Sequence, residues 1–130
     1  MDEILEHLRN ALPGRYTIER EIGRGGMATV YLVTEDHPHR EVAIKVLSPE
    51  YATFVMRERF LREIDVISKL IHPHIVPVYA AGDADGLLYY VMPFIEGESL
   101  SHRIAREGRL PVPMALRIAR EVASALDYAH

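Results

Sequence analysis

Apolar residues change their spacing along the first two thirds of the chain, and the change predicts several strands and one long helix. β-Branched and aromatic residues gather in short runs bounded by turn-forming residues, which is typical of strands. Strands are expected near 16–24, 29–35, 40–47, 76–81 and 87–92. Over residues 54–70 apolar positions recur at three- and four-residue steps, the period of an amphipathic helix. The pattern therefore predicts a sheet with one long helix against it.

Three further helices are expected outside this block. Residues 2–12 have the pattern of a short amphipathic leader helix, and Pro13-Gly14 ends it, which sets residues 1–15 apart from the rest. Ser99 is suited to cap a helix over 99–107. A last helix near 113–129 carries a broad apolar face.

A glycine-rich turn and a lysine supply the candidate chemistry. Gly23, Gly25 and Gly26 lack the Cβ that would keep the backbone away from phosphate oxygens, and Lys45 closes a later apolar run. The Gly-x-Gly-x-x-Ala spacing ending at Ala28 also fits a dinucleotide-binding turn, but that turn must open a helix. The residues after Ala28 favour a strand, so the turn is expected to join two strands. A helix beginning at Gly25 would support the dinucleotide alternative.

A glycine-rich hairpin followed by a Val-Ala-Ile-Lys strand, residues 42–45, resembles the N-terminal lobe of a protein kinase. The glycine loop is most similar to that of bacterial serine/threonine kinases of eukaryotic type. The resemblance covers residues 16–130. It implies an α+β fold with a five-stranded antiparallel N-lobe and one helix, αC, over 16–92. A hinge over 93–97 and the helices αD and αE of a truncated C-lobe over 98–130 would follow.

The resemblance also implies an ion pair. In protein kinases a glutamate of αC pairs with the strand lysine and directs it toward the α- and β-phosphates of ATP. Glu63 lies beside the apolar face that contains Phe60 and Ile67, so it is expected to pair with Lys45 as the catalytic pair. Glu58 is the alternative, but it lies away from that face.

Carried over residue by residue, the resemblance implies an ATP site. The nucleotide-binding residues are then Ile22, Gly23, Arg24, Gly25, Gly26, Met27, Ala28, Thr29, Val30, Ala43, Lys45, Met92, Pro93, Ile95 and Ser99. Val30 and Ala43 would enclose the adenine ring, and Met92 would close the back of the pocket. The carbonyl of Pro93 and the N–H of Ile95 would bind adenine. Proline departs from the glutamate often found at that hinge position, yet it keeps the carbonyl.

Two motifs of the family do not occur in the sequence. The His-Arg-Asp catalytic loop and Asp-Phe-Gly, which supply the catalytic base and Mg²⁺ ligands, are missing, and the last helix reaches His130 without a stop signal. We expect the N-terminal portion of a kinase that transfers the γ-phosphate of ATP to Ser or Thr of protein substrates, with these residues inactive by themselves. The alternative is a nucleotide-binding pseudokinase or regulatory module. The coding sequence after His130 would distinguish the two.

Composition limits the remaining function classes. Hydrophobic residues at 48% and charged residues at 26% are ordinary for a globular domain, and the net charge of −4 argues against nucleic-acid binding. The acidic start is unlike a secretory signal, and no apolar run is long enough to span a membrane. A cytoplasmic location is expected, with a membrane anchor further along the full-length protein left open. With no cysteine there are no disulfides and no thiol chemistry.

Two further clusters have an ordinary explanation. His72 and His74 could be metal ligands, but no third ligand stands at suitable spacing, so no metal site is expected. Both lie in a His-Pro-x-Ile turn that, by the resemblance, follows αC. Asp83 and Asp85 could suggest a cation site, but the pattern of a calcium loop does not continue past Gly86. A solvated hairpin turn over residues 82–86 is expected there.

Overall fold

The computed structural model describes residues 3–37, 39–51 and 53–130. The chain forms two units. The first runs up to Lys69 and resumes over Pro77–Phe94, and the second contains Leu70–Val76 and Ile95–His130. Residues 1 and 2 of the expected leader lie outside the described residues.

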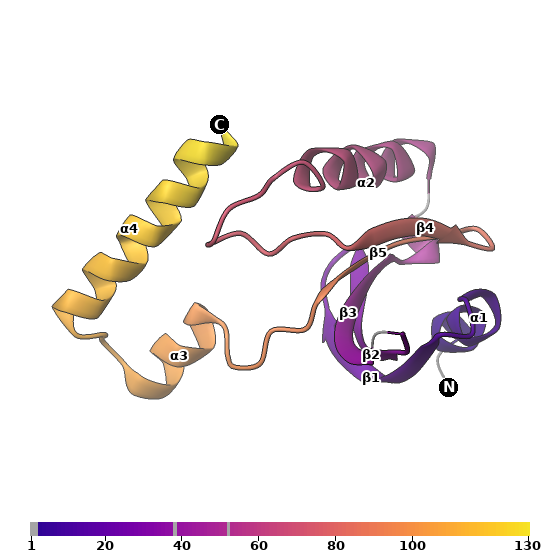
Figure 1. Ribbon diagram of the computed structural model, residues 1–130, viewed down its shortest axis with the longest axis horizontal. Coiled ribbons are helices and arrows are strands. Elements are labelled where there is room, and N and C mark those ends of the chain that lie inside the picture. Colours follow the sequence, from indigo (N-terminus) through magenta and orange to yellow (C-terminus); the bar gives the residue numbers. More distant parts are fainter. Residues whose placement is uncertain (1–2, 38, 52) are drawn as a thin grey trace. The chain divides into compact units, whose positions relative to one another are not determined.

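The first unit is built on a five-stranded antiparallel sheet with the order β1-β2-β3-β5-β4 (Figure 1). The strands are β1 (Tyr16–Arg24), β2 (Ala28–Glu35), β3 (Arg40–Leu47), β4 (Ala80–Ala84) and β5 (Leu87–Pro93). Two helices accompany the sheet, α1 (Glu3–Ala11) and α2 (Phe54–Ile67), with a short 3₁₀ turn at Pro49–Tyr51. The α+β prediction and the five-stranded antiparallel sheet with one long helix are confirmed.

The fourth strand was predicted in the wrong place. It covers Ala80–Ala84 and not 76–81, and the turn is only Asp85-Gly86 rather than the whole of residues 82–86. Both turn residues take a positive φ, 52° and 95°, the geometry that joins paired antiparallel strands through two residues. Ala84 therefore lies opposite Leu87, and the pairing extends back from there.

Helix α2 is shorter than predicted. It begins at Phe54, where the side chain of Thr53 accepts a hydrogen bond from the N–H of Met56 at 3.3 Å, and it ends at Ile67 rather than Leu70. Ser68 caps it, with its N–H donating to the carbonyl of Ile64 at 2.9 Å. The apolar period alone could not fix this end, because the residues beyond it keep a partly helical spacing.

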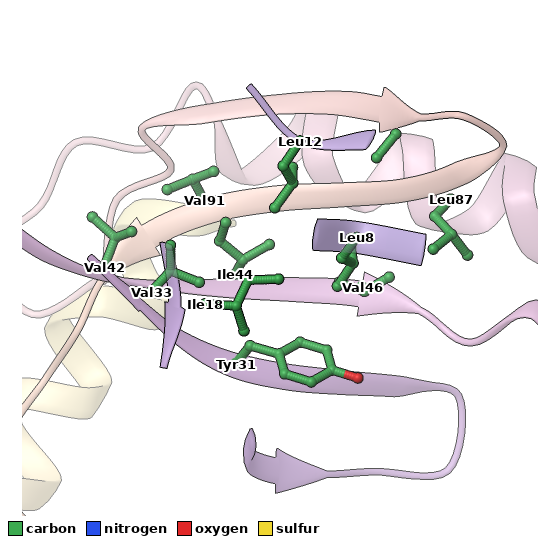
Figure 2. Packing of buried hydrophobic residues seen from close by; sticks show 11 residues of the cluster. Leu8, Leu12, Ile18, Tyr31, Val33, Val42, Ile44, Val46, Leu87 and Val91 are labelled. Carbon is green, nitrogen blue, oxygen red and sulfur yellow. The ribbon is translucent and has the colours of Figure 1, made fainter. Parts of the chain in front are cut away.

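Each face of the sheet is covered by a different helix. One buried cluster includes Val42, Ile44 and Val46 of β3 together with Leu8 and Leu12, at α1 and just after it (Figure 2). On the opposite face Leu47 and other strand residues pack with Phe60 of α2. Side chains alternate along a strand, so β3 sends every second residue to each helix. Lys45 thereby lies on the α2 face.

The second unit contains α3 (Leu100–Glu107) and α4 (Val112–Ala129). Ser99 caps α3 as expected, accepting from the N–H of His102 at 3.1 Å, and Gly108 ends that helix at a φ of 79°. None of the side chains of α3 and α4 is buried. Across the part of the chain that the structure describes, no helix combines the length and apolar character needed to cross a bilayer.

The leader helix is predicted to contribute to stability, because Leu8 is fully buried against the sheet. Leu8→Ala should lower the free energy of unfolding by about 2–5 kcal/mol, the usual cost of such a cavity. Urea denaturation followed by circular dichroism measures it, with the exposed Glu6→Ala as the matched control. Equal midpoints for Leu8→Ala and wild type would contradict docking of α1 in solution.

Candidate functional site

A cavity of about 450 Å³ lies in the first unit, beside the glycine-rich turn between β1 and β2. Its lining combines the turn with side chains of β2, β3 and α2: Gly23, Arg24, Gly25, Gly26, Met27, Ala28, Val30, Lys45, Leu47, Met56, Arg59, Phe60 and Glu63. Backbone forms one wall and cationic and apolar side chains form the others. Such a mixture suits a ligand with a charged and an apolar part.

The glycine-rich turn closes as a hairpin. The N–H of Gly25 donates to the carbonyl of Ala28 at 2.8 Å, and strand pairing continues on both sides of the turn. No helix starts at Gly25, so the dinucleotide alternative is wrong. A Cβ added to Gly26 would meet no protein atom within 4 Å, and one on Gly25 would come no closer than 3.7 Å to the Ala28 carbonyl. What glycine contributes here is open space beside the backbone.

Lys45 and Glu63, which the family resemblance pairs, do meet. The Lys45 Nζ lies 3.3 Å from the Glu63 Oε1. Their side chains are 31% and 44% exposed, so the pair borders the cavity and remains accessible. It is Glu63, and not the alternative Glu58, whose carboxylate reaches the lysine. Helix α2 therefore lies close enough to β3 for Glu63 to contact Lys45 at the edge of the cavity.

Tyr90 is a third member of this cluster, and the sequence analysis missed it. Its hydroxyl donates to the Glu63 Oε1 at 3.0 Å, and the Lys45 Nζ lies 5.6 Å from its ring centroid. Tyr90 stands directly opposite Lys45 in the pairing of β3 with β5. The sequence signal was its place two residues before Met92, which puts both side chains on the same face of β5.

The charge states in the cluster follow from its contacts. Burial acts to lower the pKa of Lys45, but Tyr90 and Glu63 act in the opposite direction, and the net effect raises the lysine pKa above its ordinary value. Burial also raises the pKa of Tyr90, although the nearby Lys45 opposes that shift. At neutral pH the lysine is therefore a cation and the tyrosine a neutral hydroxyl that donates.

The residues expected to surround adenine follow the same alternation. Val30 lies opposite Lys45, and Ala43 lies opposite Met92, so all four side chains lie on the α2 face of the sheet. Thr29 stands opposite Val46, which belongs to the α1 cluster. Its side chain is fully buried on that other face, and its Oγ1 has no hydrogen-bond partner among the described residues.

The remaining expected residues are divided between the two units. Pro93 ends β5 in the first unit, while Ile95 and Ser99 belong to the second. Ile22 is half-buried at an irregularity of β1, between Glu21 and Gly23. Ile22 and Thr29, like Ala43, Met92 and Pro93, are not among the residues that line the cavity.

Helix α2 contributes cavity residues that the sequence analysis missed. Met56, Arg59 and Phe60 line the cavity together with Glu63. Arg59 stands one helical turn before Glu63, and that i, i+4 spacing was the available signal. It adds a further cationic residue to Lys45 and Arg24 in the lining of the cavity.

The two histidines have partners within the second unit. The N–H of His74 donates to the Nδ1 of His72 at 3.1 Å, so this nitrogen is an acceptor and the neutral ring carries its proton on Nε2. The Nε2 then donates to the Ser124 Oγ at 3.1 Å. His72 is thus a structural donor, and it is not placed as a base for Ser124. Within the described ranges, no three His, Cys, Asp or Glu side chains are grouped to hold a metal ion.

Asp83 also has structural partners. Its carboxylate accepts from the N–H of Gly86 at 2.6 Å, and its other oxygen lies 3.3 Å from the Arg57 guanidinium. Arg57 donates as well to the carbonyl of Gly86 at 2.9 Å. These contacts attach the first turn of α2 to the hairpin between β4 and β5.

Comparison with known proteins relates this geometry to one family. The protein kinase domain family matches residues 16–130. The serine/threonine-protein kinase PknD of Mycobacterium tuberculosis is 41% identical over 118 residues, which are 90% of this chain and 18% of that protein. The serine/threonine-protein kinase PrkC of Bacillus subtilis is 43% identical over 122 residues, 92% of this chain and 18% of that protein. The chain thus spans about one fifth of the length of these relatives.

A solved structure agrees with the sequence comparison. The crystal structure of the Mycobacterium tuberculosis PknI kinase domain matches with a TM-score of 0.75 at 40% identity. The match covers 92% of this chain and 50% of that one. The similarity therefore extends over both units described above and over half of the solved kinase domain.

Proposed function

The chain belongs to the protein kinase family, and we propose that it forms the ATP-binding part of a serine/threonine protein kinase. The observation that carries the proposal is the Lys45–Glu63 pair at the edge of a cavity walled by a glycine-rich hairpin. Phosphoryl transfer depends mainly on positioning and on electrostatic stabilisation of phosphate charge. A directed lysine beside an open backbone provides both.

In the proposed complex the phosphates of ATP lie along Gly23–Met27, and Lys45 contacts the α- and β-phosphates. Glu63 keeps the lysine directed, because an ammonium on a flexible stem has no preferred direction of its own. Val30, Ala43 and Met92 enclose the adenine ring. The Pro93 carbonyl and the Ile95 N–H bind its edge, and Ser99 approaches the ribose.

Transfer requires groups that these residues do not supply. The family uses ATP with Mg²⁺, but its catalytic base and metal ligands come from His-Arg-Asp and Asp-Phe-Gly motifs that are missing from this sequence. We therefore propose that residues 1–130 bind nucleotide without transferring phosphate. A full-length protein lacking those motifs would be a nucleotide-binding regulatory module, the alternative function.

Partners and location follow from the same proposal. The full-length kinase would phosphorylate Ser or Thr of other proteins. The net charge of −4 gives no support to nucleic-acid binding. A cytoplasmic location of this domain fits the need for ATP.

Lys45→Met is the most direct substitution for testing the function. In the full-length protein that carries this chain, it should reduce transfer of labelled phosphate from ATP to a generic protein substrate by about hundredfold, as loss of a preorganised charge contact does. Lys69→Met is the matched control, because Lys69 is the only other lysine in residues 1–130 and pairs on the surface with Asp65.

Full activity of Lys45→Met, or equal loss in both variants, would contradict the proposal. The 130-residue chain without the missing motifs should show no transfer in the same assay. Phosphorylation of the substrate by that chain alone would contradict the proposed division between binding and chemistry.

Gly26→Val tests whether the open space at the turn holds the ligand. The added side chain meets no protein atom and needs no unusual φ, so the thermal midpoint should stay close to that of wild type. Affinity for ATP, measured by calorimetric titration, should fall about tenfold, because loss of one contact near 1.4 kcal/mol has that effect. Gly14→Val, equally free of protein neighbours but far from the turn in sequence, is the control. Unchanged affinity in Gly26→Val would exclude the turn from the phosphate site.

A further inference from the structure

The hydroxyl of Tyr90 contacts the same carboxylate oxygen that contacts Lys45. Tyr90 donates to the Glu63 Oε1 at 3.0 Å, and the Lys45 Nζ lies 3.3 Å from that atom. We propose that Tyr90 is a positioning residue, which holds Glu63 and thereby α2 in the arrangement that directs Lys45. This inference rests on the proposed kinase function, since its consequence is the rate of phosphoryl transfer.

The position of the Tyr90 hydroxyl is fixed by the fold. Tyr90 is 4% exposed, and its ring packs against Phe60 of α2 with centroids 5.6 Å apart. It lies on a central strand of the sheet, directly opposite Lys45. A buried ring on a paired strand has few alternative rotamers, so its oxygen is a rigid anchor for the carboxylate.

The Lys45–Glu63 contact is a weak anchor by comparison. Both side chains are long and partly exposed, and ion pairs of that kind contribute little because solvent screens them and ordering costs entropy. A hydrogen bond from a buried neutral donor to a charged acceptor contributes more. If α2 moved outward, Glu63 would lose both contacts, and the buried Tyr90 hydroxyl would lose its acceptor.

Tyr90 also completes the attachment of α2 to the sheet. Arg57 holds the first turn of the helix to the β4–β5 hairpin, because its guanidinium donates a hydrogen bond to the Gly86 carbonyl at 2.9 Å. Phe60 packs one turn later, Glu63 follows at the level of the cavity, and Ile64 and Ile67 add partly buried apolar contacts. Without Tyr90, the Glu63 carboxylate itself would be held by the partly exposed Lys45 alone.

The matched pair Tyr90→Phe and Tyr89→Phe tests the proposal in the full-length protein. Each variant removes one hydroxyl and keeps the ring, but Tyr89 belongs to the α1 face of the sheet. Tyr90→Phe should lower kcat for phosphoryl transfer about tenfold, the effect of losing a hydrogen bond to a charged group. Tyr89→Phe should leave kcat unchanged. Wild-type kcat in Tyr90→Phe would overturn the proposal.

A double-mutant cycle separates positioning from a general structural role. In a Glu63→Ala background Tyr90 has no carboxylate to hold, so adding Tyr90→Phe should change the residual kcat by less than about twofold. An undiminished tenfold effect in that background would overturn the proposal, because Tyr90 would then act without Glu63.

Hydrogen exchange gives a readout that does not depend on activity. Tyr90→Phe should speed exchange of the α2 amides over residues 60–66, Tyr89→Phe should not, and Glu63→Ala should remove the difference. If the wild-type protein transfers no phosphate, the proposed kinase function is wrong. Hydrogen exchange would still test whether the Tyr90 hydroxyl holds Glu63 and α2 in place. Unchanged α2 exchange in Tyr90→Phe would then overturn the inference.

Discussion

The contact between Lys45 on β3 and Glu63 on α2 is the constraint on which the site depends. The two residues are 18 positions apart, and they meet because two periodicities are satisfied together. Alternation along β3 sends Val42, Ile44 and Val46 into the α1 cluster and therefore puts Lys45 on the other face. The period of α2 buries Phe60 against that face and brings Glu63 toward the lysine.

The two helices support the site in different ways. Helix α1 covers the face of the sheet that carries no candidate chemistry, and Leu8 completes the core that keeps the strands in register. Helix α2 contributes side chains to the cavity itself, and Arg57 and Phe60 attach it to the strands. The glycine-rich turn adds open backbone to this framework. The proposed site therefore depends on one sheet, with α1 packed on one face and the cavity-lining helix α2 packed on the other.

Local patterns were sufficient for β1 and β3, because their signals lie within short windows of sequence. The Lys45–Glu63 pair was expected from the family resemblance, and the period of α2 only favoured Glu63 over Glu58. Local patterns failed for β4, where a two-residue turn at Asp85-Gly86, and not the apolar run before it, sets the register. Tyr90 was missed for a related reason. Its place two residues before Met92 gives its face of β5, but the pairing of β3 with β5, strands far apart in the chain, decides that it stands opposite Lys45. The pairing of β2 with β3 likewise puts Thr29 opposite Val46, and therefore on the α1 face of the sheet.

Labelling of lysines by a reactive nucleotide measures whether the Lys45 ammonium lies beside the phosphates of bound ATP. An ATP analogue with an acyl group on its terminal phosphate transfers that group to an amine beside the phosphates, forming an amide and releasing ATP. The chain has two lysines, and Lys69 has a side chain 72% exposed. Peptide mass spectrometry should find acylation mainly on the less exposed Lys45, suppressed by excess ATP. Preferential labelling of Lys69, or labelling of Lys45 that ATP does not suppress, would contradict the account.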